Sequence, residues 1–361
     1  MTFASDNWAG ASDHVMAVLG EANNGQAAAY GDDGWTARAK AAICDWFERD
    51  CAVFFVSTGS AANAIALATL GRPGGVVFAH VDAHITCDEA GGPLLFFPGT
   101  QLELVDGPEG RLAPQALKDR LASYLPISVH HGRPTVVSIT NLNEIGRCST
   151  PAQVNEISAL AKEHGCAVHM DGARFANAVA HLGASPADLS WRAGVDALSL
   201  GLTKTGGWCA EAVVFFDRAV EEDAMFRHKQ AAQLFSKNRF AAAQFVALLG
   251  EDHALSMARS ANAAAGSVAD ILAASPFASL LHRPQGNEVF AYLSAAAQES
   301  LRQDEIVAAP WSSRSAHLPA PPQADWSLMR FVASFRTTQE DIRSVETALS
   351  RCQSAPVARA V

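Results

Sequence analysis

The sequence lacks the features of membrane and exported proteins. No stretch approaches the roughly 18 uninterrupted apolar residues that a membrane-spanning helix needs. The opening segment, residues 1–7, has no basic residue followed by a hydrophobic signal region. We therefore expect a cytoplasmic protein with no membrane partner.

Positive charge and paired cysteines are also scarce. The chain has 27 Lys and Arg against 37 Asp and Glu, a net charge of -10, so no excess of cations attracts a phosphate backbone. None of its seven cysteines forms a Cys-x-x-Cys pair, which argues against a disulfide framework and a zinc knuckle. We expect no nucleic-acid partner. His80 and His84 have a spacing that could hold a metal on a helix, but they adjoin a predicted strand and no third ligand is evident, so we expect no metal site.

The length and composition indicate a two-domain globular protein. Of the 361 residues, 49% are apolar and 18% charged, which excludes intrinsic disorder. We predict a large ligand-binding domain with an N-terminal arm at residues 1–250 and a smaller α+β domain at residues 251–361. The low content of charged residues also suits a homo-oligomer.

Seven short apolar segments between residues 52 and 216 alternate with helical patterns, which is typical of a mainly parallel sheet flanked by helices. Several are apolar at nearly every position, as in strands covered on both faces. Helices are predicted at 60–70 and 151–164, an Ala-rich helical region at 225–273, and later strands at 288–293 and 328–334. The seven predicted strands are Val53–Val56, Val76–Phe78, Leu102–Val105, Val136–Ile139, Ala167–Met170, Ala197–Leu200 and Ala212–Phe216.

The turn Ser57–Asn63 follows the first of these strands and opens a helix. Glycine lets a backbone approach an anion closely, and the free amides and hydroxyls of a helix start point toward it. Phosphate is the obvious ligand. The turn matches neither the dinucleotide-binding nor the Walker pattern, and an ordinary capped helix is the alternative.

Asp171 and Arg174 follow a predicted parallel strand, at the sheet edge where ligands bind. A carboxylate there could pair with a cationic ring nitrogen, and the planar guanidinium with a carboxylate. The alternative is that the two side chains pair with each other and cap the next helix.

Lys204 is unusual among the six lysines of the chain. The other five lie in segments that have a helical pattern and contact water, whereas Lys204 follows an apolar strand in an uncharged, Gly-rich turn. Desolvation and nearby positive charge would make its amine a usable nucleophile. A lysine in such a loop can also be structural or bind an anion.

The order of these three features favours one cofactor. Pyridoxal phosphate requires a cradle for its phosphate, a carboxylate that keeps its ring nitrogen protonated, and an amine that links to its aldehyde. The chain supplies them as Ser57–Ser60, Asp171 and Lys204.

With these residues in place, the sequence resembles the threonine aldolases, pyridoxal-phosphate enzymes with the aspartate aminotransferase-like fold (fold type I), and most of all their bacterial low-specificity L-type branch. The resemblance covers nearly the whole chain and is weakest at 277–327. It is carried by Phe3–Asn7, Tyr30–Asp33, Trp35–Arg38, Gly59, Asp82–His84, His169–Arg174, Thr203–Lys204 and Arg330–Phe331.

The resemblance implies a role for each site residue. Lys204 would link to the cofactor, Asp171 would bind the pyridine nitrogen, Ser57, Gly59 and Ser60 would bind phosphate, and His84 would stack on the ring. Ser5, Arg174 and Arg330 would hold the substrate carboxylate. Because sites of this family lie between subunits, Tyr30 and either Lys237 or Arg239 would reach a neighbour's site in a homodimer or homotetramer.

The implied reaction is retro-aldol cleavage of L-threonine, L-allo-threonine and related β-hydroxy-α-amino acids to glycine and an aldehyde. His84 and Glu144 are the candidates for the base that removes the hydroxyl proton. Glu144 stands where many members have a histidine, and burial could raise its pKa enough for this role.

Other functions of the same fold are alternatives. They include phenylserine cleavage, other lyase reactions, transamination and hydroxymethyl transfer. A non-catalytic relative that keeps the fold is a further alternative, although it would not need the Lys204, Asp171 and Arg174 set.

Overall fold

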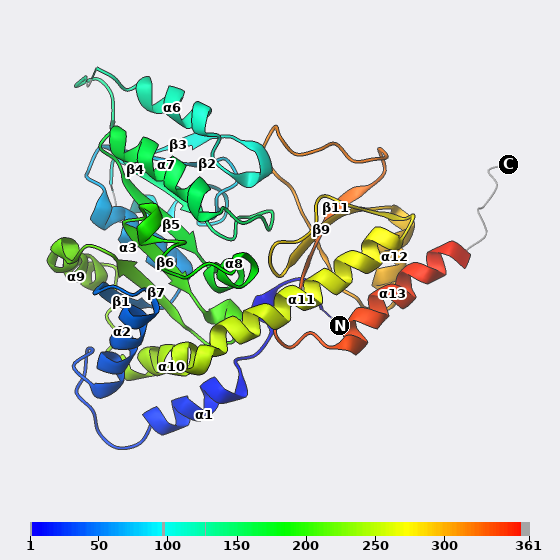
Figure 1. Ribbon diagram of the computed structural model, residues 1–361, viewed down its shortest axis with the longest axis horizontal. Helices are drawn as coiled ribbons and strands as arrows, with labels where there is room; N and C mark the ends of the chain where they lie inside the picture. The colour runs from blue at the N-terminus through cyan, green and yellow to red at the C-terminus, as the bar shows by residue number, and fades with distance from the viewer. Residues whose placement is uncertain (1, 96–97, 127, 355–361) are drawn as a thin grey trace.

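The computed structural model describes residues 2–95, 98–126 and 128–354. Its central element is a seven-stranded sheet of order β1-β7-β6-β5-β4-β2-β3, in which β7 is antiparallel to both neighbours and the other pairs are parallel (Figure 1). All seven predicted strands are present. They are β1 Ala52–Val56, β2 Gly75–His80, β3 Gln101–Val105, β4 Arg133–Thr140, β5 Ala167–Gly172, β6 Ala197–Gly201 and β7 Glu211–Phe215.

One face of this sheet packs on α3 (Gly59–Leu70). Its sequence is free of charged residues, and residues 62–69 are all buried. The sheet covers one side of α3, and α5 (Gly92–Leu95) and α9 (Glu221–Gln230) contact its other side. Because no face of this helix meets water, its sequence has no polar stripe.

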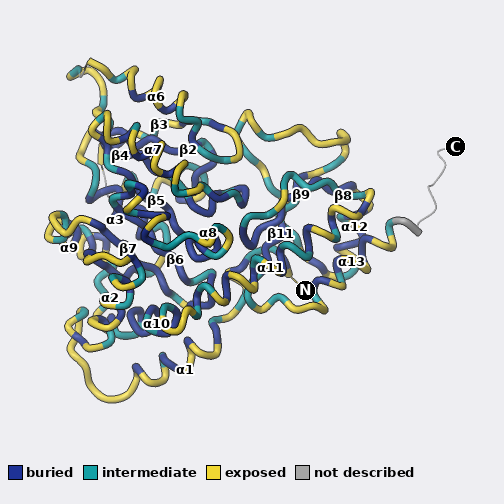
Figure 2. The backbone as a smooth tube through the Cα atoms, in the orientation of Figure 1, coloured by how far each residue is buried: buried dark blue, intermediate teal, exposed yellow. Residues whose placement is uncertain are grey.

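The other face of the sheet carries the largest hydrophobic cluster, with helices from both halves of the chain packed over it. Figure 2 shows most of the sheet dark blue, apart from its edge strand β3, beneath helices whose outer faces are exposed. A capping box between Thr150 and Gln153 fixes the start of α7. The remaining helices of the larger unit, on either face of the sheet, are α1 Asp13–Ala22, α2 Gly34–Trp46, α4 His84–Cys87, α6 Pro114–Ala122, α7 Pro151–Glu163, α8 Phe175–Leu182 and α10 Arg239–Leu249.

The smaller unit is an antiparallel sheet of order β10-β11-β9-β8 with its own core. The long helix α11 contacts α8 of the larger unit and β8, β9 and α13 of the smaller one, so it joins the two (Figure 1). The elements are α11 His253–Ala274, β8 Ala278–Leu280, β9 Glu288–Leu293, α12 Ala295–Gln303, β10 Ala309–Pro310, β11 Ser327–Val332 and α13 Gln339–Ser354. The predicted architecture is confirmed, and the domain boundary at residue 250 stays a prediction.

The predicted helical region 225–273 is interrupted twice, which corrects that expectation. Residues 231–238 leave the helix after α9, where Ala232 has a φ of 55° and Gln233 turns toward Ser57. A second break at 250–252 contains Glu251 and Asp252, both with positive φ. The sequence pattern did not reveal these interruptions, because the high alanine content favours helix throughout the region.

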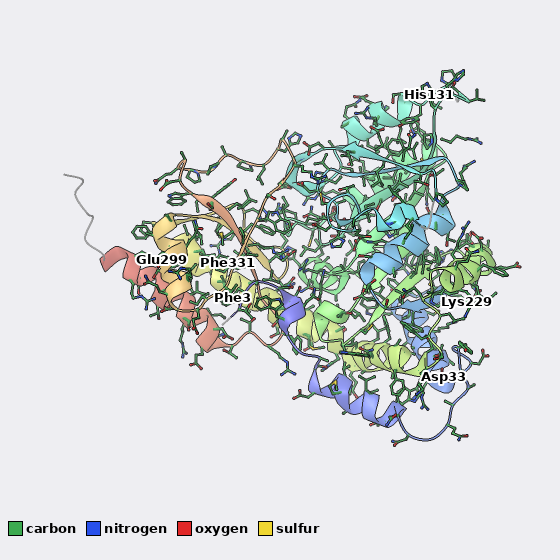
Figure 3. The ribbon with its side chains drawn as sticks, turned by 180° about the vertical axis from the view of Figure 1, so that it is seen from behind. Phe3, Asp33, His131, Lys229, Glu299 and Phe331 are labelled. Carbon is green, nitrogen blue, oxygen red and sulfur yellow. The ribbon has the colours of Figure 1, made fainter. Side chains whose placement is uncertain are left out.

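The N-terminal arm crosses to the smaller sheet. Phe3 exchanges backbone hydrogen bonds with Val307 and Val332, each at 2.7 Å, and its ring packs edge-on against Phe331 (Figure 3). This anchoring carries Asp6, in the short helix η1 (Asp6–Trp8), between the two sheets. None of the helices among the described residues has the length and apolar character needed to cross a membrane.

Candidate active site

A cavity of about 290 Å³ lies at the carboxyl edge of the larger sheet, where β1, β4, β5 and β6 end. Crevices at this edge are the usual ligand sites of open α/β sheets. The structure brings most of the predicted site residues together there. Those that line the cavity are Ser57, Gly59, Ser60, His84, Glu144, Asp171, Arg174 and Lys204.

The turn before α3 offers free donors to an anion. The Thr58 hydroxyl caps the helix by accepting the Ala61 N–H at 3.1 Å. Within the described part of the chain, the N–H groups of Gly59 and Ser60 meet no acceptor. Ser57 differs, because its N–H and hydroxyl both donate to Gln233 Oε1 at 2.8 Å. The donors available to a phosphate are therefore those of Gly59 and Ser60.

Lys204 lies in the short helix η4 (Thr203–Thr205) between β6 and β7. Gly206 ends this turn with a φ of 91°, a conformation that glycine adopts without strain. In the described ranges, the Lys204 amine has no hydrogen-bond or ion-pair partner, and it lines the cavity. The amine is thus placed to react with a bound aldehyde.

Asp171 is held from two sides at the end of β5. Its Oδ2 accepts a hydrogen bond from the side chain of Asn63 at 2.8 Å, and its Oδ1 accepts the Ala173 N–H at 3.0 Å. It is not paired with Arg174, so the alternative in which these two side chains cap a helix together is not found.

Asn63 continues this network to His84. Its amide also donates to Glu89 Oε1 at 2.8 Å, and the same oxygen lies 2.7 Å from His84 Nδ1. The hydrogen bond to Glu89 raises the pKa of His84 above its usual range. Neither Asn63 nor Glu89 was assigned a role from the sequence. Their signals were weak, since Asn63 lies within the anion turn and Glu89 is one acidic residue after a helix.

Glu144 lines the same cavity. Its Oε1 accepts the His84 N–H at 2.9 Å and the Thr140 hydroxyl at 3.0 Å, whereas its buried Oε2 has no partner among the described residues. Burial, with the neighbouring charge of Asp171, raises the pKa of Glu144 to about 7. A carboxyl group with this pKa can hold or release a proton near neutral pH.

Arg174 lies between two buried carboxylates. Its Nε and Nη2 donate to the two oxygens of Asp6 at 2.8 and 3.1 Å, and its Nη1 is 3.2 Å from Glu288 Oε2. Burial opposes protonation, but the charges of Asp6 and Glu288 outweigh it and raise the pKa of Arg174. The guanidinium thus faces the cavity as a fixed cation.

Four predicted site residues, and Arg239 as the alternative to Lys237, do not line the cavity of this chain. Ser5 caps η1 by accepting the Asn7 N–H at 3.2 Å, and Arg330 lies behind Glu288, with Nη1 3.4 Å from Glu288 Oε1. Tyr30 and Lys237 are exposed on the surface. Their assignment to a neighbour's site stays a prediction.

Glu211 is a further cavity residue that the sequence reasoning missed. It opens β7, and burial raises its pKa to about 7, although hydrogen bonds from Thr203 oppose the shift. The sequence contains only a modest indication that Glu211 belongs to the site. Glu211 is the one charged residue between Lys204 and Asp217, at the start of an apolar strand.

Comparison with known proteins gives one family. A model of the beta-eliminating lyase family matches residues 2–296. The low-specificity L-threonine aldolase of Pseudomonas aeruginosa is 44% identical over 300 residues, and that of a Pseudomonas species 41%; each match spans 83% of this chain and 86% of the relative. The solved threonine aldolase of Leishmania major superposes with a TM-score of 0.88 at 26% identity, covering 97% of this chain and 99% of that one.

Proposed function

The chain belongs to the beta-eliminating lyase family and to the threonine aldolases within it, and from this membership we propose a lyase that cleaves β-hydroxy-α-amino acids. Its substrates are L-threonine, L-allo-threonine and related compounds, and its products are glycine and an aldehyde. The observation that carries the proposal is the gathering of Lys204, Asp171 and the free Gly59 and Ser60 amides around one cavity.

The cavity residues fit pyridoxal phosphate. The unengaged amides of Gly59 and Ser60 suit its phosphate, the fixed carboxylate of Asp171 suits its ring nitrogen, and the unpaired amine of Lys204 suits its aldehyde. Bound there, the cofactor supplies the electron sink for cleavage of a bond at the substrate α-carbon.

The role of the protein side chains is to hold the cofactor and to orient the substrate on it. Asp171, fixed by Asn63 and Ala173, would hold the ring nitrogen of the cofactor and favour its protonated form. His84, held by Glu89, would contact the cofactor ring. Arg174 would attract the substrate carboxylate and thereby orient the bonds at the substrate α-carbon.

Glu144 is the base in this proposal. Glu144 lines the cavity, its buried Oε2 has no partner among the described residues, and its pKa of about 7 would let it accept the proton of the substrate β-hydroxyl. His84 donates its backbone N–H to the other oxygen of Glu144, so it positions the base. The Glu144 carboxylate takes the place of the histidine found in many relatives.

We further propose that the enzyme acts in the cytoplasm as a homodimer or homotetramer with shared sites. The exposed positions of Tyr30 and Lys237 support this, because neither reaches the cavity of its own chain.

A substrate panel tests the function. Threonine, allo-threonine, serine and phenylserine are incubated with enzyme loaded with pyridoxal phosphate, and both products are identified. Glycine with acetaldehyde from threonine or allo-threonine is expected. Formation of ammonia and a keto acid would contradict the proposal. Cleavage of phenylserine alone would show that threonine is not the substrate.

A further inference from the structure

Four charged side chains form a closed cluster between the two sheets. Arg174 binds Asp6 on one side and lies 3.2 Å from Glu288 on the other, and Arg330 lies 3.4 Å from the second oxygen of Glu288. Glu288 therefore bridges an arginine of the larger unit and an arginine of the smaller one. The side chains of Asp6 and Glu288 are fully buried.

Glu288 occupies this bridge with an incomplete set of hydrogen bonds. Its Oε1 accepts from Arg330 Nη1, whereas its Oε2 accepts no hydrogen bond from any described residue, despite the nearby guanidinium of Arg174. Arg174 lines the cavity but Arg330 does not. A substrate carboxylate entering the cavity can therefore contact both arginines only if Glu288 yields its place.

The charge balance shows what this exchange requires. Two carboxylates and two guanidinium groups give the resting cluster a net charge of zero. A substrate carboxylate would add one negative charge to a buried volume, which is costly unless a proton accompanies it. The other charged groups that face the cluster are Lys204 of η4, Glu144 before α7 and Asp88 after α4.

We propose that Glu288 is an internal counterion that holds the place of the substrate carboxylate between Arg174 and Arg330. When a substrate carboxylate takes that place, Glu288 picks up one proton from solvent and becomes neutral, with no other bond made or broken. Glu288 thus positions the two arginines and couples substrate binding to proton uptake. The proposal rests on the proposed function, because the incoming group is the carboxylate of an amino acid.

The acid–base character of Glu288 agrees with this role. Burial raises the pKa of Glu288 above its usual range, although the charges of Arg174 and Arg330 oppose the shift. Engaging both arginines with a second carboxylate removes that opposition and adds repulsion, so the proton becomes easier to take up.

A ligand without an amino group separates carboxylate binding, and the proton uptake coupled to it, from reaction with the cofactor. 3-Hydroxybutyrate has the carboxylate and β-hydroxyl of the substrate but cannot link to the cofactor. Its binding to the holoenzyme is measured by titration calorimetry from pH 6 to 9, in buffers of different ionisation enthalpy. Where free Glu288 is ionised, the dissociation constant should rise about tenfold for each pH unit, with uptake of about one proton.

Two variants test whether Glu288 is the group that takes up the proton when the ligand binds. In Glu288→Gln, the dissociation constant should rise less steeply with pH than in the wild type, and proton uptake should fall by about one where Glu288 of the free wild type is ionised. Glu103→Gln is the matched control, because it removes a carboxylate that pairs with Arg120 at 3.1 Å on the far edge strand β3. That variant should keep the wild-type pH dependence.

Three results would overturn the proposal: absence of binding, a wild-type dissociation constant that does not change with pH, or a pH dependence and proton uptake in Glu288→Gln equal to those of the wild type. If that variant does not fold, infrared difference spectra of the wild type replace it. A protonated carboxyl band that grows on binding supports the proposal, and its absence refutes it. These outcomes do not depend on product formation, so failure of the proposed aldol cleavage would be seen separately.

Discussion

The side-chain amide of Asn63 lies 2.8 Å from Asp171 Oδ2. Together with the Ala173 N–H on the other oxygen, it fixes the plane of the Asp171 carboxylate. A carboxylate held in one orientation can keep a proton on a ring nitrogen without first reorganising. We therefore expect substitution of Asp171 to reduce turnover more than substitution of any other cavity residue except Lys204.

We expect Asp171→Asn to retain part of its pyridoxal phosphate but to lose at least about 100-fold in kcat, because a neutral amide cannot hold the ring nitrogen protonated. Cofactor content by absorbance and turnover of threonine measure the two effects. Asp188→Asn, which changes an exposed carboxylate paired with Arg192, should leave both unchanged. A fully active Asp171→Asn would remove the role given to this residue.

Glu89 should control the protonation of His84. Since the hydrogen bond to Glu89 raises the pKa of His84, Glu89→Gln should lower it, which a proton NMR titration of the imidazole measures. A raised histidine pKa stabilises the fold below the unfolded value of about 6.5, and this contribution is lost as pH rises through the folded value. The variant should therefore lose thermal stability at pH 6 and not at pH 9. An unshifted His84 titration would contradict the pairing.

Glu144 should set the acidic limb of the pH–rate profile. Its pKa of about 7 means that the ionised base becomes available as pH rises through neutrality. We expect kcat/KM of the wild type to rise across pH 6 to 8, and Glu144→Gln to lose roughly 100- to 10,000-fold along with that limb. Glu156→Gln, on the exposed surface of α7, is the control. Retention of the limb in Glu144→Gln would point to a different base.

Glu211 should destabilise the cofactor-free protein at alkaline pH. Its carboxyl pKa is raised from 4.5 to about 7, so its contribution to stability is present below pH 4.5 and lost as pH rises through 7. At about 1.4 kcal/mol for each pKa unit, the loss is about 3 kcal/mol by pH 8. Glu211→Gln should recover most of it, because the amide oxygen can still accept from Thr203. Urea unfolding at pH 5 and pH 8 tests this, with the exposed Glu299→Gln as control; equal gains at both pH values would refute it.

The strands and the cofactor-facing residues could be predicted because their signals are local. Short apolar segments bounded by turns identified the seven strands of the larger sheet. Lys204 and Asp171 were found because each is a charged residue directly at the end of an apolar strand, where a buried charge needs a functional or structural partner.

The partners of those residues could not be predicted, since they come from distant parts of the chain. Arg174 meets Asp6 and Glu288 only because the N-terminal arm and the smaller sheet converge on it. Glu89 and Asn63 are 26 residues apart in sequence and share one hydrogen bond. No spacing rule relates such pairs, because tertiary packing alone sets their contact.

The attachment site of the cofactor tests the central claim most directly. Holoenzyme is reduced with borohydride, digested, and searched by mass spectrometry for a pyridoxyl group on each of the six lysines of the chain. The account predicts the group on Lys204, with no modified peptide in Lys204→Ala. A pyridoxyl group on any other lysine, or none in an enzyme that binds the cofactor and turns over threonine, would contradict it.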